Sequence, residues 1–359
     1  MTGPFSLLDG HEQIVYGSDP EAGLQCIIAI HSTVLGPALG GTRFHAYETE
    51  EQALADVLRL SKAMAYKAAC AGLDLGGGKA VIIGDPALDK TEQLLRAYGR
   101  IVESLGGRYV TACDVGTYPA DMSVVRRETT WATGAEIAAG GSGDSGVSTA
   151  VGVFIGMQAC LERVFGATSV AGRHIAIQGV GKVGRRLAEH LAREGAKLSV
   201  ADVDPAAAEW CAERFGAEIV NIDKIHAVDA DVFSPNALGG AINPTTRAEL
   251  LCRIVAGAAN NQLLTHEDGE ALAERGILYA PDYVINSGGL IQVSDELGPG
   301  GYSPARAQQK VEQIADRLRE VFDVAERERL STTAAADHIA ERRVAALGRI
   351  RGFWLPSTS

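Results

Sequence analysis

The chain has 359 residues, of which 46% are hydrophobic and 22% charged, and its formal net charge is −12. This length exceeds what one hydrophobic core usually supports, so we expect a globular protein of two domains. The acidic balance argues against a nucleic-acid partner, which would need a basic face. The six scattered cysteines form no C-x-x-C pair, the first residues resemble no secretion signal, and no apolar run reaches about 18 residues. We therefore expect a cytoplasmic protein with free thiols, no metal and no membrane span.

The first part of the chain mixes predicted strands and helices. Short apolar runs predict strands over 24–30, 42–47, 80–83 and 109–112. Apolar residues at helical spacing predict helices over 49–69 and 91–105, and a proline opens another over 119–127. Thr49, followed three residues later by Gln52, fits a capping box at the start of the first helix.

The glycine-rich stretch 139–146 predicts a linker or hinge, with an ordinary flexible loop as the alternative. We expect a helix over 148–165. Apolar runs then alternate with helical stretches, which indicates an α/β fold with a doubly wound parallel sheet. These runs lie at 174–177, 198–201, 232–233, 254–256 and 277–280. A long amphipathic helix is expected over 303–327, and the tail 342–359 is less regular.

A glycine motif follows the predicted strand 174–177 and opens a helix at about residue 185. Its residues are Gly179, Val180, Gly181, Lys182, Val183 and Gly184, and the next strand ends at Asp202 and Val203. This order is the dinucleotide-binding fingerprint: tight turn, close approach to a pyrophosphate, and a helix N-terminus facing the phosphates. Asp202 would bind both ribose hydroxyls and repel a 2′-phosphate, which favours NAD over NADP. The alternative is a glycine turn in an ordinary βαβ unit.

Three charged residues stand out in the first part of the chain. Lys79 lies between three glycines and an apolar strand, and in a partly dry cleft near a second ammonium it could act as a general base. Asp114 follows a predicted strand, where α/β proteins place functional groups, although a turn aspartate is the alternative. Lys67 ends a predicted helix and on its own is more often a surface charge.

Six motifs, in order along the chain, resemble the glutamate/leucine/phenylalanine/valine dehydrogenase family. They are LGPALGGTR at 35–43, GGGK at 76–79, TACDVGT at 111–117, PNALGG at 235–240, GAANNQ at 257–262 and APDYVINSGG at 280–289. The resemblance covers about residues 10–345, and the valine and leucine dehydrogenases are the most similar members. It implies an N-terminal substrate and catalytic domain (1–136), a Rossmann-like NAD-binding domain (137–328) and a C-terminal segment (329–359) that packs back on the first domain.

The resemblance also implies the reaction and the roles of residues. The reaction is reversible oxidative deamination of an L-amino acid, with NAD, to a 2-oxo acid, ammonium and NADH. Lys67 would bind the substrate carboxylate, Lys79 would activate water as general base, and Asp114 would move protons to and from the amino nitrogen. Further substrate contacts are implied for Gly40, Gly41, Asn261 and Asn286, and further cofactor contacts for Thr149, Asn236, Ala237, Ala258, Ala259, Asn260 and Asn261. The family is usually oligomeric, so a homo-oligomer is expected.

By the same resemblance, four apolar residues line the side-chain pocket: Leu39, Ala112, Leu290 and Val293. None can pair with a carboxylate, which disfavours glutamate and favours an aliphatic, branched substrate. The alternatives are an aromatic amino-acid dehydrogenase acting on phenylalanine or tryptophan, and a catalytically silent NAD-binding paralogue. Asn236 stands where relatives often carry cysteine, and Ser287 where alanine is usual; both departures lie near the expected cofactor site.

Overall fold

The computed structural model describes residue 8 and residues 10–351 of the chain. The chain forms two compact units, each made of several segments. Unit 1 comprises Met1–Ser145, Gln292–Ala307 and Ala340–Ser359, and unit 2 comprises Gly146–Ile291 and Gln308–Ile339. The contiguous functional domains expected from the sequence (1–136, 137–328 and 329–359) stay a prediction.

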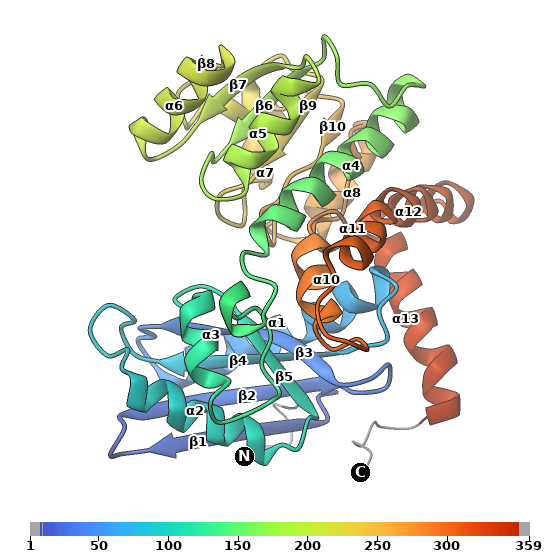
Figure 1. Cartoon of the computed structure of the whole chain (residues 1–359). Helices are drawn as coiled ribbons and strands as arrows, with labels where there is room; N and C mark the ends of the chain where they lie inside the picture. Colours follow the sequence, from blue (N-terminus) through green and yellow to red (C-terminus); the bar gives the residue numbers. More distant parts are fainter. Residues whose placement is uncertain (1–7, 9, 352–359) are drawn as a thin grey trace. The chain divides into compact units, whose positions relative to one another are not determined.

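Unit 1 is built on a mixed five-stranded sheet in the order β1-β2-β4-β3-β5 (Figure 1). Its strands are β1 (Gln13–Asp19), β2 (Leu24–Ser32), β3 (Ala38–His45), β4 (Gly76–Ile83) and β5 (Tyr109–Cys113), and its first helices are α1 (Glu50–Cys70), α2 (Glu92–Ser104) and α3 (Pro119–Val125). Strand β2 pairs antiparallel with β1 and β4, whereas β3 runs parallel to β4 and β5. The carboxyl ends of β3, β4 and β5 therefore meet at one edge of the sheet.

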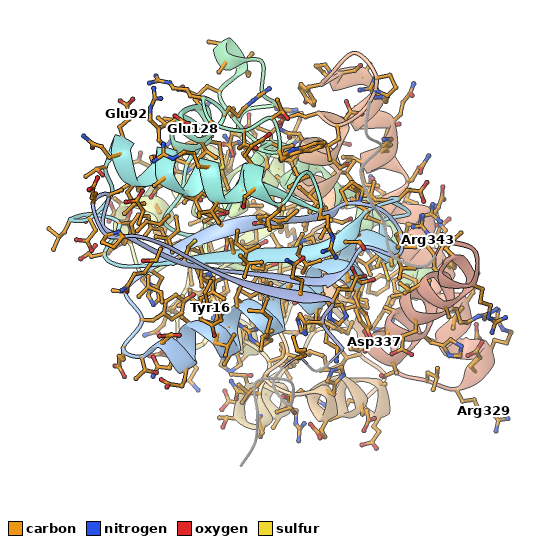
Figure 2. All side chains as sticks on the ribbon, turned by 90° about the horizontal axis from the view of Figure 1, so that it is seen from below. Tyr16, Glu92, Glu128, Arg329, Asp337 and Arg343 are labelled. Carbon is orange, nitrogen blue, oxygen red and sulfur yellow. The ribbon has the colours of Figure 1, made fainter. Side chains whose placement is uncertain are left out.

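Both faces of this sheet are covered by helices (Figure 2). Successive side chains of a strand point to opposite faces. Along β2, Ile28 and Ile30 belong to the core packed against α2 and α3, while Ile27 and Ala29 pack with Val57 of α1. The nearly continuous apolar run of β2 thus reflects a strand buried on both faces.

The glycine-rich stretches at residues 40–41 and 76–78 lie within β3 and β4, so both strands begin before the predicted strands 42–47 and 80–83. The reason is close backbone packing. A Cβ on Gly40 would lie 1.7 Å from the carbonyl oxygen of Gly78, and a Cβ on Gly77 would lie 2.2 Å from the backbone nitrogen of Ala65 in α1. Glycine therefore lets α1 and the neighbouring strands approach β4.

Helix α1 begins as predicted, with one change in its cap. The Thr49 hydroxyl accepts a hydrogen bond from the N–H of Gln52 at 3.2 Å. The side chain of Gln52 then accepts from the N–H of Glu48, not from that of Thr49 as a capping box requires.

Unit 2 contains a six-stranded sheet in the order β11-β10-β9-β6-β7-β8. Its strands are β6 (His174–Gln178), β7 (Lys197–Ala201), β8 (Glu218–Ile219), β9 (Val232–Pro235), β10 (Ile254–Val255) and β11 (Leu278–Tyr279). All pairings are parallel. The helices of this part are α4 (Gly146–Phe165), α5 (Gly184–Arg193), α6 (Pro205–Phe215), α7 (Pro244–Glu249), α8 (His266–Glu274) and α9 (Asp282–Ile285). The predicted doubly wound parallel sheet is confirmed, with its order reversing at β6.

Helix α4 corrects the expectation that the chain holds no apolar stretch of membrane-spanning length. By length and composition alone it could cross a membrane. Its packing is that of a core helix, however. A Cβ on Gly152 would lie 2.6 Å from Ile314 Cδ1, and one on Gly156 would lie 2.5 Å from Ile285 Cγ1. The glycines of α4 thus let other helices of unit 2 pack closely against it.

The last part of the chain is more helical than predicted, with helices α10 (Gly288–Asp295), α11 (Pro304–Glu312), α12 (Ile314–Glu328) and α13 (Thr332–Arg351). The single helix expected over 303–327 is two helices, separated at Gln313, whose N–H bonds back three residues to Lys310. The irregular tail expected from 342 is helical to residue 351. Arg343 of α13 donates to the carbonyl of Ala69 and the carboxylate of Asp74, which fixes this end of α13 in unit 1.

Candidate active site

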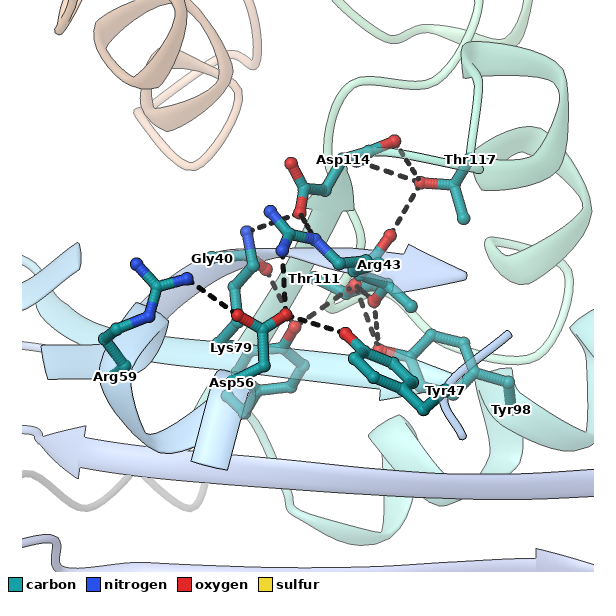
Figure 3. A network of polar contacts seen from close by, with 12 residues as sticks. Gly40, Arg43, Tyr47, Asp56, Arg59, Lys79, Tyr98, Thr111, Asp114 and Thr117 are labelled. Carbon is teal, nitrogen blue, oxygen red and sulfur yellow. Dashed lines mark hydrogen bonds and ion pairs between the residues drawn. The ribbon is translucent and has the colours of Figure 1, made fainter. Parts of the chain in front are cut away.

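Lys79 and Asp114 form a buried ion pair at the edge of the unit 1 sheet (Figure 3). Lys79 lies in β4, its side chain 7% exposed, and Asp114 directly follows β5. The Nζ–Oδ2 distance is 2.8 Å. The N–H of Asp114 donates to the Thr117 hydroxyl, which in turn donates to the carbonyl of Thr42 in β3. Three neighbouring strands thus fix the position of this pair.

A second cation approaches the same carboxylate oxygen. Nε of Arg43, near the end of β3, lies 3.1 Å from Asp114 Oδ2. Nη1 of Arg43 lies 2.7 Å from Oδ2 of Asp56 on α1, and that oxygen also accepts from the Tyr47 hydroxyl at 2.7 Å. Arg43 belongs to the motif at 35–43 but had no predicted role, and Asp56 and Tyr47 were not predicted from the sequence.

These contacts decide the charge of the two carboxylates. Burial raises the pKa of Asp114, but Lys79 and Arg43 outweigh burial and lower the pKa to about 2. Burial likewise raises the pKa of Asp56, and the Tyr47 hydroxyl and Arg43 bring it below its ordinary value. Burial alone would lower the pKa of Arg43, yet the two carboxylates raise it. At neutral pH this network therefore holds ionised groups of both signs.

The other predicted substrate residues of unit 1 lie around this pair. In the β3–β5 pairing, Gly40 faces Thr111 and Gly41 faces Ala112. A Cβ on Gly41 would lie 2.9 Å from Cβ of Asp114, so the glycine leaves room for the aspartate. Leu39 is buried beside them in β3.

Two further predicted substrate residues of unit 1 lie on helices. Lys67 lies in the last turn of α1 and is half-buried. Val293 in α10 is buried and lies near Gly134, since a Cβ there would be 3.5 Å from Val293 Cγ1.

The glycine motif of unit 2 has the geometry of a dinucleotide-binding turn. Gly179 adopts a left-handed backbone with φ +88°, and a Cβ on Gly184 would lie 2.0 Å from the Gly179 carbonyl oxygen. A Cβ on Gly181 would meet nothing within 4 Å, so space is open there for the close approach of a ligand. Val183, just before α5, has a side chain that cannot cap the helix, which leaves the capping role to an anion.

Asp202 follows β7 beside this turn. Its carboxylate accepts from the N–H of Val180 at 2.7 Å and from the N–H of Asp204 at 2.9 Å. Val203 is exposed next to it, and Lys182 is exposed within the turn. The residues present therefore fit the pyrophosphate and ribose of a dinucleotide.

The remaining predicted cofactor residues gather at the carboxyl ends of β6, β9 and β10. A Cβ on Gly179 would lie 2.8 Å from Cβ of Ala237, which places the loop after β9 against the glycine turn. Asn236 accepts from the N–H of Ala258 at 2.8 Å. The Asn286 amide donates to the Ala258 carbonyl at 3.1 Å and to the side chain of Asn260 at 2.9 Å.

Four further predicted site residues also lie in unit 2. Ala259 is buried and donates its N–H to the Pro235 carbonyl, and Asn261 adopts a left-handed backbone with φ 52°. Thr149 lies in the first turn of α4, its nitrogen 3.1 Å from a Cβ built on Gly288. Leu290 is buried in α10.

No group of three or more His, Cys, Asp or Glu residues that could hold a metal ion occurs within residues 10–351. The six cysteines all lie within the described residues, and none of them is in a disulfide.

The comparisons with known proteins all indicate the same family. The model described as Glu/Leu/Phe/Val dehydrogenase, dimerisation domain, matches residues 11–131, and that of glutamate/leucine/phenylalanine/valine dehydrogenase matches residues 140–208 and 206–352. The chain is 48% identical to a leucine dehydrogenase of Geobacillus stearothermophilus over 345 residues, covering 96% of this chain and 94% of the relative. It is 51% identical to a valine dehydrogenase of Streptomyces coelicolor over 339 residues, covering 94% and 93%. The solved structure of L-tryptophan dehydrogenase from Nostoc punctiforme is 43% identical, with a TM-score of 0.82 and coverage of 95% and 97%.

Proposed function

The chain belongs to the glutamate/leucine/phenylalanine/valine dehydrogenase family, and from this premise we propose that it is an NAD-dependent dehydrogenase of branched-chain L-amino acids. It oxidatively and reversibly deaminates an L-amino acid to the 2-oxo acid, ammonium and NADH. The observation that carries this proposal is the buried Lys79–Asp114 ion pair, because binding a dinucleotide requires neither residue.

In this proposal NAD supplies the acceptor for the hydride that leaves the substrate α-carbon. The glycine turn 179–184 holds the pyrophosphate, and Asp202 binds the ribose hydroxyls and disfavours a 2′-phosphate. Thr149, with the loops 236–237 and 258–261, contacts the rest of the cofactor. The hydrogen bonds of Asn236 and Asn286 to Ala258 support this assignment, since they fix the loop that would carry those contacts.

The residues of unit 1 carry the proton chemistry. Lys67 binds the substrate carboxylate and thereby orients the α-hydrogen. The ionised Asp114 accepts a proton from the amino nitrogen, so that the uncharged amine can release the hydride from its α-carbon and form the iminium. Lys79, as the neutral amine, takes a proton from the water that attacks the iminium carbon. Asp114 then returns its proton to the amino nitrogen and the carbon–nitrogen bond breaks. The hydroxyl proton leaves with the departing ammonia as ammonium, which gives the 2-oxo acid.

The proposed substrate side chain is aliphatic. Leu39, Ala112 and Val293 of unit 1 are apolar and buried, so a carboxylate placed among them would lose its hydration without gaining a partner. Glutamate is therefore a poor substrate. The likeness to a tryptophan dehydrogenase keeps an aromatic substrate as the second candidate.

We also propose the compartment, the oligomeric state and the domain roles of the enzyme. It acts in the cytoplasm as a homo-oligomer, a state supported by the match of residues 11–131 to a model described as a dimerisation domain. The domain containing Lys67, Lys79 and Asp114 (about 1–136) binds the amino acid. The Rossmann-like domain (about 137–328) binds NAD, and the segment 329–359 supports the first domain.

One panel of rates tests the function. Initial rates are measured with valine, leucine, phenylalanine, tryptophan and glutamate, each with NAD and with NADP. The proposal expects the highest kcat/KM for valine or leucine with NAD. Faster reaction with phenylalanine or tryptophan would establish the aromatic alternative. The reverse reaction is measured with ammonium and the 2-oxo acids that correspond to these five amino acids. A protein that binds NADH but oxidises it with none of them would be the catalytically silent paralogue.

A further inference from the structure

Arg43 connects two carboxylates on different elements of unit 1 (Figure 3). Its Nε contacts Asp114 at 3.1 Å, and its Nη1 contacts Asp56 at 2.7 Å. The guanidinium is planar and rigid, so fixing one edge on Asp56 also fixes the direction from which Nε reaches Asp114. Neither Asp56 nor Arg43 has a part in the proton chemistry described above.

These contacts are shielded from water. The side chains of Arg43, Asp114 and Asp56 are 22%, 18% and 15% exposed. Charges in such surroundings interact far more strongly than an exposed surface pair, whose effect is usually below about 1 kcal/mol. A change of charge at Arg43 or Asp56 should therefore be felt at the Lys79–Asp114 pair.

Other titratable groups lie on the elements around the pair. Helix α1 contributes Arg59, 54% exposed and paired with Asp56 at 2.8 Å, and the half-buried Lys67. Tyr47 follows β3, donates to Asp56 and stacks edge-on with His45. The hydroxyl of Tyr98 on α2 contacts the Thr42 and Thr111 hydroxyls, and the hydroxyl of Tyr109 on β5 donates to the Gly40 carbonyl at 2.8 Å.

These tyrosines stay protonated under working conditions. Burial raises the pKa of Tyr109 to about 12 and moves that of Tyr98 in the same direction. Burial and the hydrogen bond to Asp56 raise the pKa of Tyr47. The buried charges next to the pair are therefore those of Arg43 and Asp56, which have opposite signs.

We propose that Arg43 and Asp56 are positioning residues that hold the Asp114 carboxylate towards Lys79 and together set the electrostatic field at this pair. Arg43 contributes the positive charge, and Asp56 orients Arg43 and offsets part of that charge. The inference builds on the proposed dehydrogenase function, because it assigns these residues to the proton chemistry of that site.

The test compares pH profiles of kcat/KM for oxidative deamination of valine or leucine. Removing a positive charge makes both Asp114 and Lys79 bind protons more tightly, whichever of them governs the acid side of the profile. Arg43→Met should therefore move that side to higher pH by about one unit, and Asp56→Asn should move it to lower pH by about half a unit. Arg43→Lys keeps the charge and should restore the wild-type profile, with kcat still reduced because a lysine cannot bridge both carboxylates.

Arg96 offers a matched control. Its Nε contacts Glu92 at 3.0 Å and its Nη1 contacts Glu128 at 2.7 Å, the same two-carboxylate pattern in the same unit (both acids are labelled in Figure 2). Arg96→Met should leave the pH profile unchanged. Equal shifts in Arg43→Met and Arg96→Met, or shifts of the same sign in Arg43→Met and Asp56→Asn, would overturn the proposal. If Arg43→Met does not fold, the test depends on Asp56→Asn, which keeps the side-chain size. Its pH profile should move to lower pH, and an unmoved profile or a move to higher pH would overturn the proposal.

A second measurement, an NMR titration of the Asp114 carboxyl, does not depend on dehydrogenase activity. In protein labelled with ¹³C at the aspartate carboxyls, the Asp114 signal is identified by its loss in Asp114→Asn. Its titration midpoint should rise in Arg43→Met by about one unit and stay in place in Arg96→Met. An unmoved midpoint overturns the inference even in an active enzyme. A moved midpoint in a protein without dehydrogenase activity means that the proposed function has failed while the electrostatic coupling holds.

Discussion

The carboxylate of Asp202 accepts a hydrogen bond from the backbone N–H of Val180 at 2.7 Å. The acid that follows β7 thus holds the middle of the glycine turn that follows β6. Its second oxygen accepts from the N–H of Asp204 and so ties the start of α6 to the same side chain. Asp202 therefore shapes the turn through hydrogen bonds, and in the proposed function it also presents a negative charge to the ribose. Substitution can separate these two effects.

Asp202→Ala should weaken NADH binding by about tenfold and reduce the preference for NAD over NADP, because it removes both effects. Asp202→Asn keeps an oxygen for the N–H of Val180 and removes only the charge. It should reduce the preference against NADP with a smaller loss of NADH affinity. NADH binding by fluorescence titration and kcat/KM with each cofactor measure both quantities.

Asp204→Ala is the control for this pair of variants. Asp204 caps α6 by accepting from the N–H of Ala206, so its loss should cost about 1 kcal/mol of stability and leave cofactor preference unchanged. If Asp202→Ala also leaves the preference for NAD over NADP unchanged, the Asp202 carboxylate does not bind the ribose hydroxyls.

The glycines of the turn differ in what a methyl group would meet. Gly181→Ala has open space and an ordinary backbone, so the protein should fold with nearly wild-type stability while NADH affinity falls at least tenfold, because the methyl group keeps the pyrophosphate from the backbone. Gly184→Ala would place Cβ 2.0 Å from a carbonyl oxygen and should destabilise unit 2 strongly. Thermal unfolding and NADH titration separate the two outcomes. Normal NADH binding by Gly181→Ala would contradict the assigned position of the pyrophosphate.

Much of this fold could be predicted from local patterns. The glycine turn and Asp202 lie where strand, turn, helix and strand periodicity put them, since each signal depends on neighbouring residues alone. Lys79 could be singled out because it follows three glycines, and Asp114 because it follows a predicted strand. Their contact at 2.8 Å depends on the pairing of β3 with β4 and β5, which no local pattern specifies.

Other features could not be predicted, for physical reasons. The strand character of 76–78 depends on how closely α1 and the neighbouring strands pack, and glycine in isolation favours a loop. Asp56 looks like any exposed helix acid in the sequence, and only tertiary packing brings it to Arg43. The break between α11 and α12 at Gln313 could not be predicted, because no proline or glycine lies there.

Lys79→Ala should reduce turnover by about a hundredfold or more, the range typical of a lost general base, while NADH binding is kept. Lys90→Ala is the matched control. Lys90 also forms a 2.8 Å pair with an aspartate, Asp121, in the same unit, and its loss should leave turnover unchanged. Turnover of Lys79→Ala equal to that of Lys90→Ala would exclude the general-base role.

Asp114 should also make stability depend on pH in the acid range. Burial opposes ionisation of this carboxyl, yet Lys79 and Arg43 hold its folded-state pKa at about 2, below the ordinary value of 3.8. A lowered folded-state pKa stabilises the protein above the ordinary value, and this stability is lost as the pH falls from about 4 towards 2. The difference in unfolding free energy between wild type and Asp114→Asn should therefore shrink by about 2 kcal/mol between pH 5 and pH 2.

Urea unfolding at a series of pH values, followed by tryptophan fluorescence, measures this difference. Trp131 packs against the core of unit 1 and reports on the unit that contains Asp114. The acid sensitivity of all other carboxyls is common to both proteins and cancels when the two curves are subtracted. Parallel curves from pH 5 to pH 2 would mean that Lys79 and Arg43 do not stabilise the ionised Asp114. A difference that instead grows on acidification would mean that the folded protein binds the Asp114 proton more tightly than the unfolded chain does.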